Sequence, residues 1–191
     1  MLKVEGIVNS IFDSMTWLLS VTVSNRVWLV DCGDVDKILE KTKGREIAGV
    51  LLTHAHFDHI YGLPALLKSF PDCMVYTNES GRETLANSKL NMSFYHEQPL
   101  TVISDQVSIC SEGDEIALFK DQMAKVYETP GHHPSCITYL VGGLLFTGDA
   151  YIPGLKVVTN LPGADKTMAK ESLGKIESLA EGKTIYPGHF V

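Results

Sequence analysis

The sequence contains no run of lysine and arginine, no paired cysteine motif and no long apolar stretch. Without a basic cluster the chain lacks the charge pattern of a nucleic-acid binder, so we expect no nucleic-acid partner. No apolar run approaches the roughly 18 residues that a membrane span requires, so we expect no membrane partner. The first residues include an early acid and no apolar core of a signal peptide, which predicts a cytoplasmic protein.

The cysteines are scattered along the chain, and none of them forms a Cys-x-x-Cys pair. That spacing argues against a structural zinc knuckle and against a thioredoxin-type redox site, and it is typical of reduced, buried thiols. Hydrophobic residues make up 45% of the chain and charged residues 20%, with a formal net charge of −7. This balance predicts a folded chain, and a length of 191 residues fits a single domain over 1–191.

The pattern of apolar residues predicts a mixed succession of strands and helices. Strands are expected at 4–8, 17–23, 26–30, 47–52, 74–76 and 184–186, with several short ones between 107 and 146. Helices are expected after Gly33, along the apolar stripe from Ile60 to Phe70, and at 79–89 and 167–181. Residues 91–99 form an aromatic segment without a period. This order favours an α/β domain with two sheets and helices outside them.

The most informative segment is residues 53–59, which read Thr-His-Ala-His-Phe-Asp-His. It sets two histidines, an aspartate and a third histidine in an H-x-H-x-D-H pattern where a buried strand is expected to end. Side chains two positions apart at a strand end point the same way, so His54 and His56 can hold one ion together. Asp58 and His59 fall where a helix begins and can face a neighbouring ion. Imidazole and carboxylate are the ligands of catalytic zinc.

Four other segments deliver a metal-capable side chain at the end of an expected strand. Residues 128–132 (Glu-Thr-Pro-Gly-His) supply His132, residues 145–149 (Leu-Phe-Thr-Gly-Asp) supply Asp149, and residues 185–189 (Ile-Tyr-Pro-Gly-His) supply His189. Upstream, Asp31 follows the strand at 26–30. The alternative interpretation is a chance set of surface histidines. Five of the seven histidines belong to this one set, which favours a site built on the edge of a rigid sheet.

Together these segments resemble the five signature motifs of the metallo-β-lactamase superfamily, and they span nearly the whole chain. The resemblance implies a four-layer αβ/βα sandwich in which two mixed β-sheets are flanked by helices and the site lies at one edge of both sheets. It implies a first metal bound by His54, His56 and His132, a second bound by Asp58, His59 and His189, and Asp149 bridging the two. Asp31 resembles the aspartate that orients a liganding imidazole through its other N–H.

The ligand set also separates branches of the superfamily. Zinc β-lactamases generally lack an aspartate bridge, so Asp149 points to glyoxalase II, lactonases and related hydrolases. Flavo-di-iron enzymes resemble H-x-E-x-D at this motif, and RNase Z enzymes carry an RNA-binding arm for which this acidic chain has no candidate. Glyoxalase II enzymes usually add a helical C-terminal domain. This sequence stops two residues after His189, so we expect that domain to be absent.

We therefore expect a binuclear metal-dependent hydrolase with two Zn²⁺ ions, for which Fe or Mn could substitute. Its expected substrate is a small-molecule acyl ester of the thioester or lactone type. A hydroxide that bridges the metals would attack the substrate carbonyl, and Asp58 would be the catalytic residue that holds it in line. The expected assembly is a monomer or a homodimer.

Two alternatives stay open. Persulfide dioxygenases share this fold and bind one iron through two histidines and an aspartate, and the same nitrogen and oxygen ligands accept iron. A mononuclear iron oxidoreductase of that type is therefore the second hypothesis. The third is a metal-binding scaffold without catalysis, against which the complete ligand set argues.

A few polar residues near the motifs are weaker candidates for contact with the substrate. They are His133, Tyr151 and Lys156, for which a turn residue or an ordinary surface residue is the simpler interpretation. His96 lies in the 91–99 segment, which could roof the pocket or be an ordinary exposed loop. Cys32 and Cys136 lie near liganding segments and are interpreted as buried structural thiols.

Overall fold

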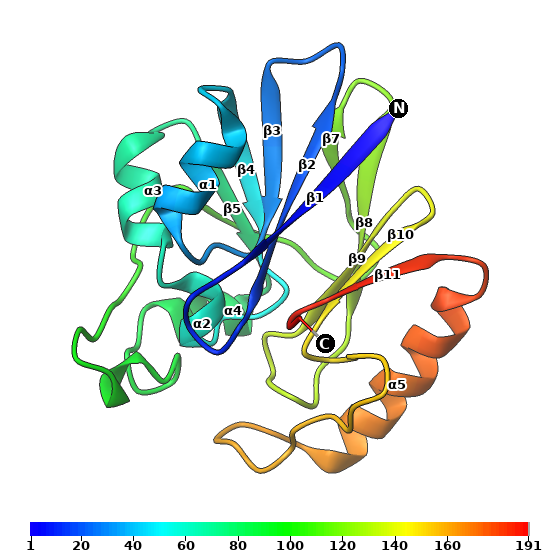
Figure 1. Cartoon of the computed structure of the whole chain (residues 1–191). Helices are drawn as coiled ribbons and strands as arrows, with labels where there is room; N and C mark the ends of the chain where they lie inside the picture. The colour runs from blue at the N-terminus through cyan, green and yellow to red at the C-terminus, as the bar shows by residue number, and fades with distance from the viewer. Residues whose placement is uncertain (191) are drawn as a thin grey trace.

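The computed structural model describes residues 1–190 and shows two β-sheets packed face to face (Figure 1). The first sheet has six strands in the order β1-β2-β3-β4-β5-β6. Its strands are β1 (Leu2–Val8), β2 (Met15–Val21), β3 (Arg26–Val30), β4 (Glu46–Leu51), β5 (Met74–Thr77) and β6 (Val107–Ile109). The first three strands are antiparallel and the last four run parallel, so the sheet is mixed.

The second sheet has five strands in the order β11-β10-β9-β8-β7. Its strands are β7 (Glu115–Phe119), β8 (Gln122–Glu128), β9 (Ile137–Val141), β10 (Leu144–Gly148) and β11 (Thr184–Pro187). Strands β7 to β10 form an antiparallel meander, and β11 joins β10 in parallel after a helical crossover. The parallel pairing carries the last strand in the same direction as β10, so both strands end at the same edge of the sheet.

Helices cover the outer faces of both sheets. They are α1 (Val35–Thr42), α2 (Phe57–Ile60), α3 (Leu63–Ser69), α4 (Glu79–Leu85) and α5 (Lys166–Ala180), with a 3₁₀ turn at Ser93–Tyr95. In Figure 1, α1 and α3 lie outside the first sheet and α5 lies outside the second. The order helix, sheet, sheet, helix is the predicted four-layer sandwich. No helix in residues 1–190 is long and apolar enough to cross a membrane.

Alternation along the strands sorts the core into layers. In β3, Val27 and Leu29 pack under the outer helices, whereas Trp28 and Val30 pack between the sheets. Because successive side chains of a strand point to opposite faces, a strand that is apolar at every position must be covered on both sides. A third, smaller cluster joins Leu145 of β10 to Ile176 of α5. The layers therefore follow from apolar runs that the sequence shows directly.

Two predicted helices are wrong in their extent. The stripe from Ile60 to Phe70 is divided between α2 and α3, because Pro64 has no N–H to offer the carbonyl of Ile60 and a continuous helix would lose that bond. The helix predicted at 79–89 ends at Leu85. There the Asn87 side-chain oxygen accepts the N–H groups of Lys89 and Leu90, which turns the chain out of the helix.

The break between α2 and α3 depends on Gly62. A Cβ at this position would lie 2.0 Å from the carbonyl oxygen of Gly33, so Gly62→Ala must push two backbone segments apart. We expect Gly62→Ala to lower the free energy of unfolding by about 1–3 kcal/mol. The matched control is Gly174→Ala on the exposed side of α5, where a Cβ meets nothing within 4 Å. That change should stabilise the helix by about 0.5–1 kcal/mol. Urea unfolding of both variants with chelator present checks the pair, and equal effects would contradict the close packing at Gly62.

Candidate metal centre

The structure brings the seven predicted ligand residues together where the ends of strands from both sheets meet. His54 and His56 lie in the loop after β4, and Asp58 and His59 lie in α2. From the second sheet, His132 follows β8, Asp149 follows β10 and His189 follows β11. The two halves of the set thus come from different layers of the sandwich.

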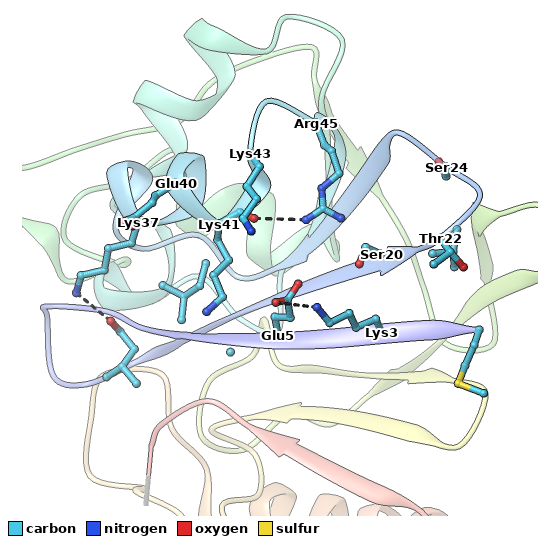
Figure 2. Close-up of a pocket in the computed structure, with 15 residues that line it drawn as sticks. Lys3, Glu5, Ser20, Thr22, Ser24, Lys37, Glu40, Lys41, Lys43 and Arg45 are labelled. Carbon is cyan, nitrogen blue, oxygen red and sulfur yellow. Dashed lines mark hydrogen bonds and ion pairs between the residues drawn. The ribbon is translucent and has the colours of Figure 1, made fainter.

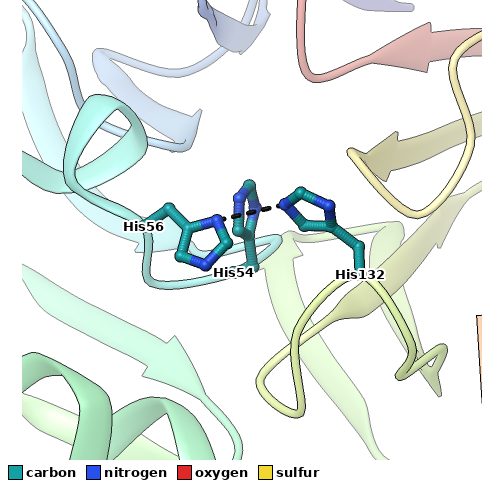
Figure 3. Close-up of side chains that lie close together, drawn as sticks. All are labelled: His54, His56 and His132. Carbon is teal, nitrogen blue, oxygen red and sulfur yellow. Dashed lines mark hydrogen bonds between the residues drawn. The ribbon is translucent and has the colours of Figure 1, made fainter. Parts of the chain in front are cut away.

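The side chains form three overlapping groups, within each of which the potential ligand atoms lie no more than 4.8 Å apart. The groups are His54, His56 and His132; Asp58, His59 and His189; and His54, His59 and Asp149. The first two groups are the two metal sets that the family resemblance implies. The third joins Asp149 to one histidine from each set, which is the position of a bridging carboxylate. Figure 3 shows the first group, with the three imidazole rings turned toward one another.

Asp149 occupies the middle of the cluster. Its carboxylate oxygens lie 3.2 Å from His189 Nε2, 3.6 Å from His132 Nε2 and 3.6 Å from His59 Nε2. Asp58 Oδ2 lies 3.3 Å from His59 Nε2 and 3.4 Å from His189 Nε2. Two carboxylates among so many imidazole nitrogens can bind a cation from several directions.

Two polar atoms of the cluster fit a bound cation because they are buried without a hydrogen-bond partner. They are His54 Nε2 and Asp149 Oδ1. Burying an unpaired polar atom is costly, and native proteins satisfy such atoms with a partner or an ion. In addition, His56 Nδ1 and His132 Nε2 face each other at 3.1 Å, within reach of a common ion (Figure 3). The donor set therefore suits a divalent metal.

In three histidines, the ring nitrogen that points away from the cluster forms a hydrogen bond, which fixes the other nitrogen toward the cluster. His132 Nδ1 donates to the Val158 carbonyl at 2.9 Å, and His189 Nδ1 donates to the Phe12 carbonyl at 2.8 Å. His59 Nδ1 lies 2.9 Å from Asp31 Oδ2. A neutral ring with its proton on Nδ1 presents a lone pair on Nε2, which is the form that a metal requires. All three rings are thus oriented as ligands.

The pKa values of the cluster divide it into neutral and charged groups. Burial lowers the pKa of His54 well below its ordinary value, and burial with the neighbouring His132 lowers that of His56 to about 3. Burial by itself raises the pKa of Asp149, but the imidazoles of His59 and His189 outweigh it and hold that pKa below its usual value. His54 and His56 are therefore neutral donors beside an ionised carboxylate, as metal ligation requires.

Asp31 lies beneath the cluster and is almost fully buried. Its carboxylate accepts hydrogen bonds from the Thr53 backbone at 2.8 Å and from the Thr53 hydroxyl at 2.7 Å, besides its contact with His59. Within residues 1–190, His59 is the ligand residue that the Asp31 carboxylate contacts. Its place is therefore the one that the resemblance implies, behind a liganding imidazole.

Several contacts that hold the site were missed at the level of the sequence. Met15 N donates to the Gly188 carbonyl at 2.7 Å, and the Ser14 hydroxyl donates to the Asp58 carbonyl at 2.7 Å. The loop between β1 and β2 thus holds parts of the site from both sheets. Of the residues that support the site, Thr53 was the one that the sequence could have indicated, because it directly precedes His54. Backbone carbonyls such as those of Phe12 and Val158 have no signal in a sequence.

The weaker candidates for contact with the substrate differ in their distance from the cluster and in their exposure. His133 is buried beside the cluster, with its ring centroid 4.7 Å from that of His56. Tyr151 packs against the cluster of Leu145 and Ile176 under α5. Lys156 is exposed and forms no ion pair within residues 1–190. His96 packs against Phe57 of α2 at a centroid distance of 4.1 Å, so the 91–99 segment contacts the helix that carries Asp58. Contact of these residues with a substrate stays a prediction.

A groove of about 800 Å³ lies away from the histidines, between β1 and the C-terminal end of α1. Figure 2 shows basic side chains along it, which come from α1 and the turn after it (Lys37, Lys41, Lys43 and Arg45) and from β1 (Lys3). Part of this charge is paired, since Lys3 contacts Glu5 at 3.0 Å and Lys37 contacts Asp34 at 2.7 Å. The groove is a charged hollow separate from the cluster.

The sequence profile of the metallo-beta-lactamase superfamily matches residues 14–189. The chain is 27% identical over 194 aligned positions to a hydroxyacylglutathione hydrolase from Hydrogenovibrio crunogenus. That alignment covers 98% of this chain and 63% of the relative, so the chain spans less than two thirds of the relative's length.

Two solved structures are similar over nearly the whole chain. The BLEG-1 B3 metallo-beta-lactamase is 26% identical with a TM-score of 0.86, covering 100% of this chain and 92% of that one. A di-iron-bound form of TTHA1623 is 26% identical with a TM-score of 0.82, covering 98% and 92%. These similarities confirm the predicted sandwich fold.

Replacing Asp31 tests whether it acts on metal binding through His59. Asp31→Asn keeps the shape of the side chain and the positive φ of 60° that asparagine tolerates, but its amide cannot hold the Nδ1 proton of His59 as a carboxylate does. We expect affinity for the second metal to fall about 10–100-fold. Asp34→Asn is the control, since Asp34 bonds Ser10 and Tyr61 outside the cluster. Zinc titration against a competing chelator measures both, and an unchanged affinity in Asp31→Asn would refute the role.

Proposed function

Because the chain belongs to the metallo-beta-lactamase superfamily, we propose that it is a binuclear metal-dependent hydrolase of small thioesters. The observation that carries the proposal is the position of Asp149, within 4.8 Å of ligand atoms from both sets of three. A carboxylate so placed can bind two ions at once, which a mononuclear site does not need. The complete ligand set argues in the same direction.

We assign the first ion to His54, His56 and His132 and the second to Asp58, His59 and His189. Zinc is the metal that this mixture of imidazole and carboxylate favours, although the similarity to a di-iron-bound form of TTHA1623 makes iron the first competitor. Two metal ions held by these residues would polarise a substrate carbonyl and lower the pKa of bound water, so that it could act as a nucleophile at neutral pH.

The chain's own contribution is to hold and orient the reacting groups. The imidazoles of His59 and His189 outweigh the effect of burial on Asp58 and keep its pKa low, so its carboxylate is ionised. Asp58 Oδ2 faces those two imidazoles, and Oδ1 forms no hydrogen bond within residues 1–190. Oδ1 is therefore free to accept a hydrogen bond from the attacking water or hydroxide and to hold it in line.

A thioester is favoured by the similarity to hydroxyacylglutathione hydrolase, which extends over 98% of this chain. The leaving thiolate is stable enough to depart without a strong general acid, and the seven residues of the cluster are histidines and aspartates. A β-lactam is the second candidate, since the similarity to the BLEG-1 B3 metallo-beta-lactamase covers 92% of that chain. Lactones belong to the same acyl chemistry.

The proposal predicts that chelation abolishes hydrolysis of a hydroxyacyl thioester and that zinc restores it. The measurement is release of free thiol from a panel that also contains simple acyl thioesters, lactones and a penicillin. We expect the thioester to have the highest kcat/KM. Turnover by demonstrably metal-free protein would overturn the metal-dependent mechanism, and preferential cleavage of the penicillin would favour the second candidate.

Metal content separates two ions from one. We expect about two zinc per chain in the loaded protein and about one in His189→Ala, because that residue belongs to the second set alone. His96→Ala is the control, since His96 stacks on Phe57 outside the cluster and should leave the count unchanged. Elemental analysis after dialysis measures all three. One iron per chain in the natively expressed protein would instead favour a mononuclear oxidoreductase.

A further inference from the structure

His133 is the one histidine beside the cluster that belongs to neither set of three ligands. It is buried to 3% exposure, and its ring lies against that of His56 at 64°. Such a residue could simply fill space. Its hydrogen bonds, however, give it a definite chemical character.

The Nδ1 atom of His133 is an acceptor. It receives the backbone N–H of Ser135 at 3.2 Å, a donor that has no lone pair to offer in return. The Ser135 hydroxyl lies 2.7 Å from the same nitrogen and itself accepts the N–H of Ala55 at 3.1 Å, which leaves its proton for His133. A ring that accepts at Nδ1 must carry its proton on Nε2.

This tautomer is the reverse of the one in three of the liganding rings. His59, His132 and His189 use Nδ1 as the outer donor and turn the Nε2 lone pair inward. His133 presents an N–H at the same atom, so it cannot bind a metal there but can donate a hydrogen bond. The difference follows from Ser135, which stands two residues after His133 and closes a small turn.

The Nε2 atom of His133 is also left accessible. It forms no hydrogen bond within residues 1–190, yet it is not among the enclosed atoms without a partner, so solvent reaches it. A Cβ at Gly163 would lie 3.5 Å from it, an ordinary van der Waals distance, so the segment around Gly163 borders this atom. The loop that carries Gly163 also carries Val158, which holds His132. The free N–H therefore lies between a metal set and a loop of the site.

We propose that His133 positions the substrate by donating a hydrogen bond from Nε2 to an oxygen of its acyl group. This inference rests on the proposed thioester hydrolysis. The acyl half is chosen because the sulfur of a thioester is a weak acceptor and the thiol half begins with that sulfur. The oxygens nearest the reacting carbon are therefore those of the acyl group, and the ring of His133 lies against that of His56, which we assign to the first ion. His133 acts here by positioning, without touching the metals.

The tautomer can be tested without any assay of activity. In a long-range ¹H–¹⁵N correlation spectrum of the zinc-loaded protein, His133 should show an unprotonated Nδ1 and a protonated Nε2, opposite to His132 and His189. The signals are assigned by their loss in His133→Asn. A proton on Nδ1 of His133 would overturn the proposal whatever the enzyme hydrolyses.

Substitution tests the role in binding. His133→Asn can retain the contact with Ser135 but has no atom at the place of Nε2, whereas His133→Gln keeps an amide donor near that place. We expect KM for a hydroxyacyl thioester to rise about 3- to 10-fold in His133→Asn with kcat changed less than about 2-fold, and His133→Gln to recover part of the loss. Zinc content and Tm should equal those of the wild type.

The outcomes separate the two proposals. Absence of thioester hydrolysis by the wild type contradicts the proposed function, while the tautomer measurement still decides the state of His133. Wild-type hydrolysis with an unchanged KM in His133→Asn contradicts the positioning role alone. If His133→Asn fails to fold, His133→Gln and the wild-type spectrum decide the matter.

Discussion

The structure depends on two ionised carboxylates, Asp58 and Asp149, that lie among imidazoles where the two sheets meet. Removing a carboxylate from water is expensive unless opposite charge or hydrogen bonds replace the lost hydration. Here the replacement is supplied by side chains from both sheets and, in the proposed function, by two cations. Neither sheet alone provides enough partners. The requirement to bury this charge thus couples the two halves of the sandwich.

That coupling explains why so much of the surrounding backbone is committed to the site. The β1–β2 loop holds both the Asp58 and the His189 segments, and the segment around Val158 holds His132. Close approach is needed as well. A Cβ at Gly188 would lie 2.1 Å from Asp149 Oδ1, and one at Gly148 would lie 2.4 Å from Thr53 Oγ1. Gly188 directly precedes His189, and Gly148 directly precedes Asp149. Each glycine therefore leaves room for the cluster.

The neighbouring imidazoles of the site illustrate how local contacts assign different chemistry to the same side chain. His132 and His133 are adjacent in the sequence, yet a carbonyl accepts from Nδ1 of the first and a backbone N–H donates to Nδ1 of the second. The first ring is thereby suited to a metal and the second to donating a hydrogen bond. No feature of the residue type itself distinguishes them, since both are imidazole rings of the same size.

The sequence by itself determined the ligand candidates and the layered fold. The H-x-H-x-D-H pattern and the strand-end positions of His132, Asp149 and His189 depend only on local periodicity and on short motifs, which can be read along the chain. Tertiary structure added the close approach of Gly62 to the Gly33 carbonyl, which acts with Pro64 where α2 ends. It alone decided the direction of each hydrogen bond at a histidine, because the partners are backbone groups from distant segments. Such groups are the same in every residue, so a sequence cannot mark them.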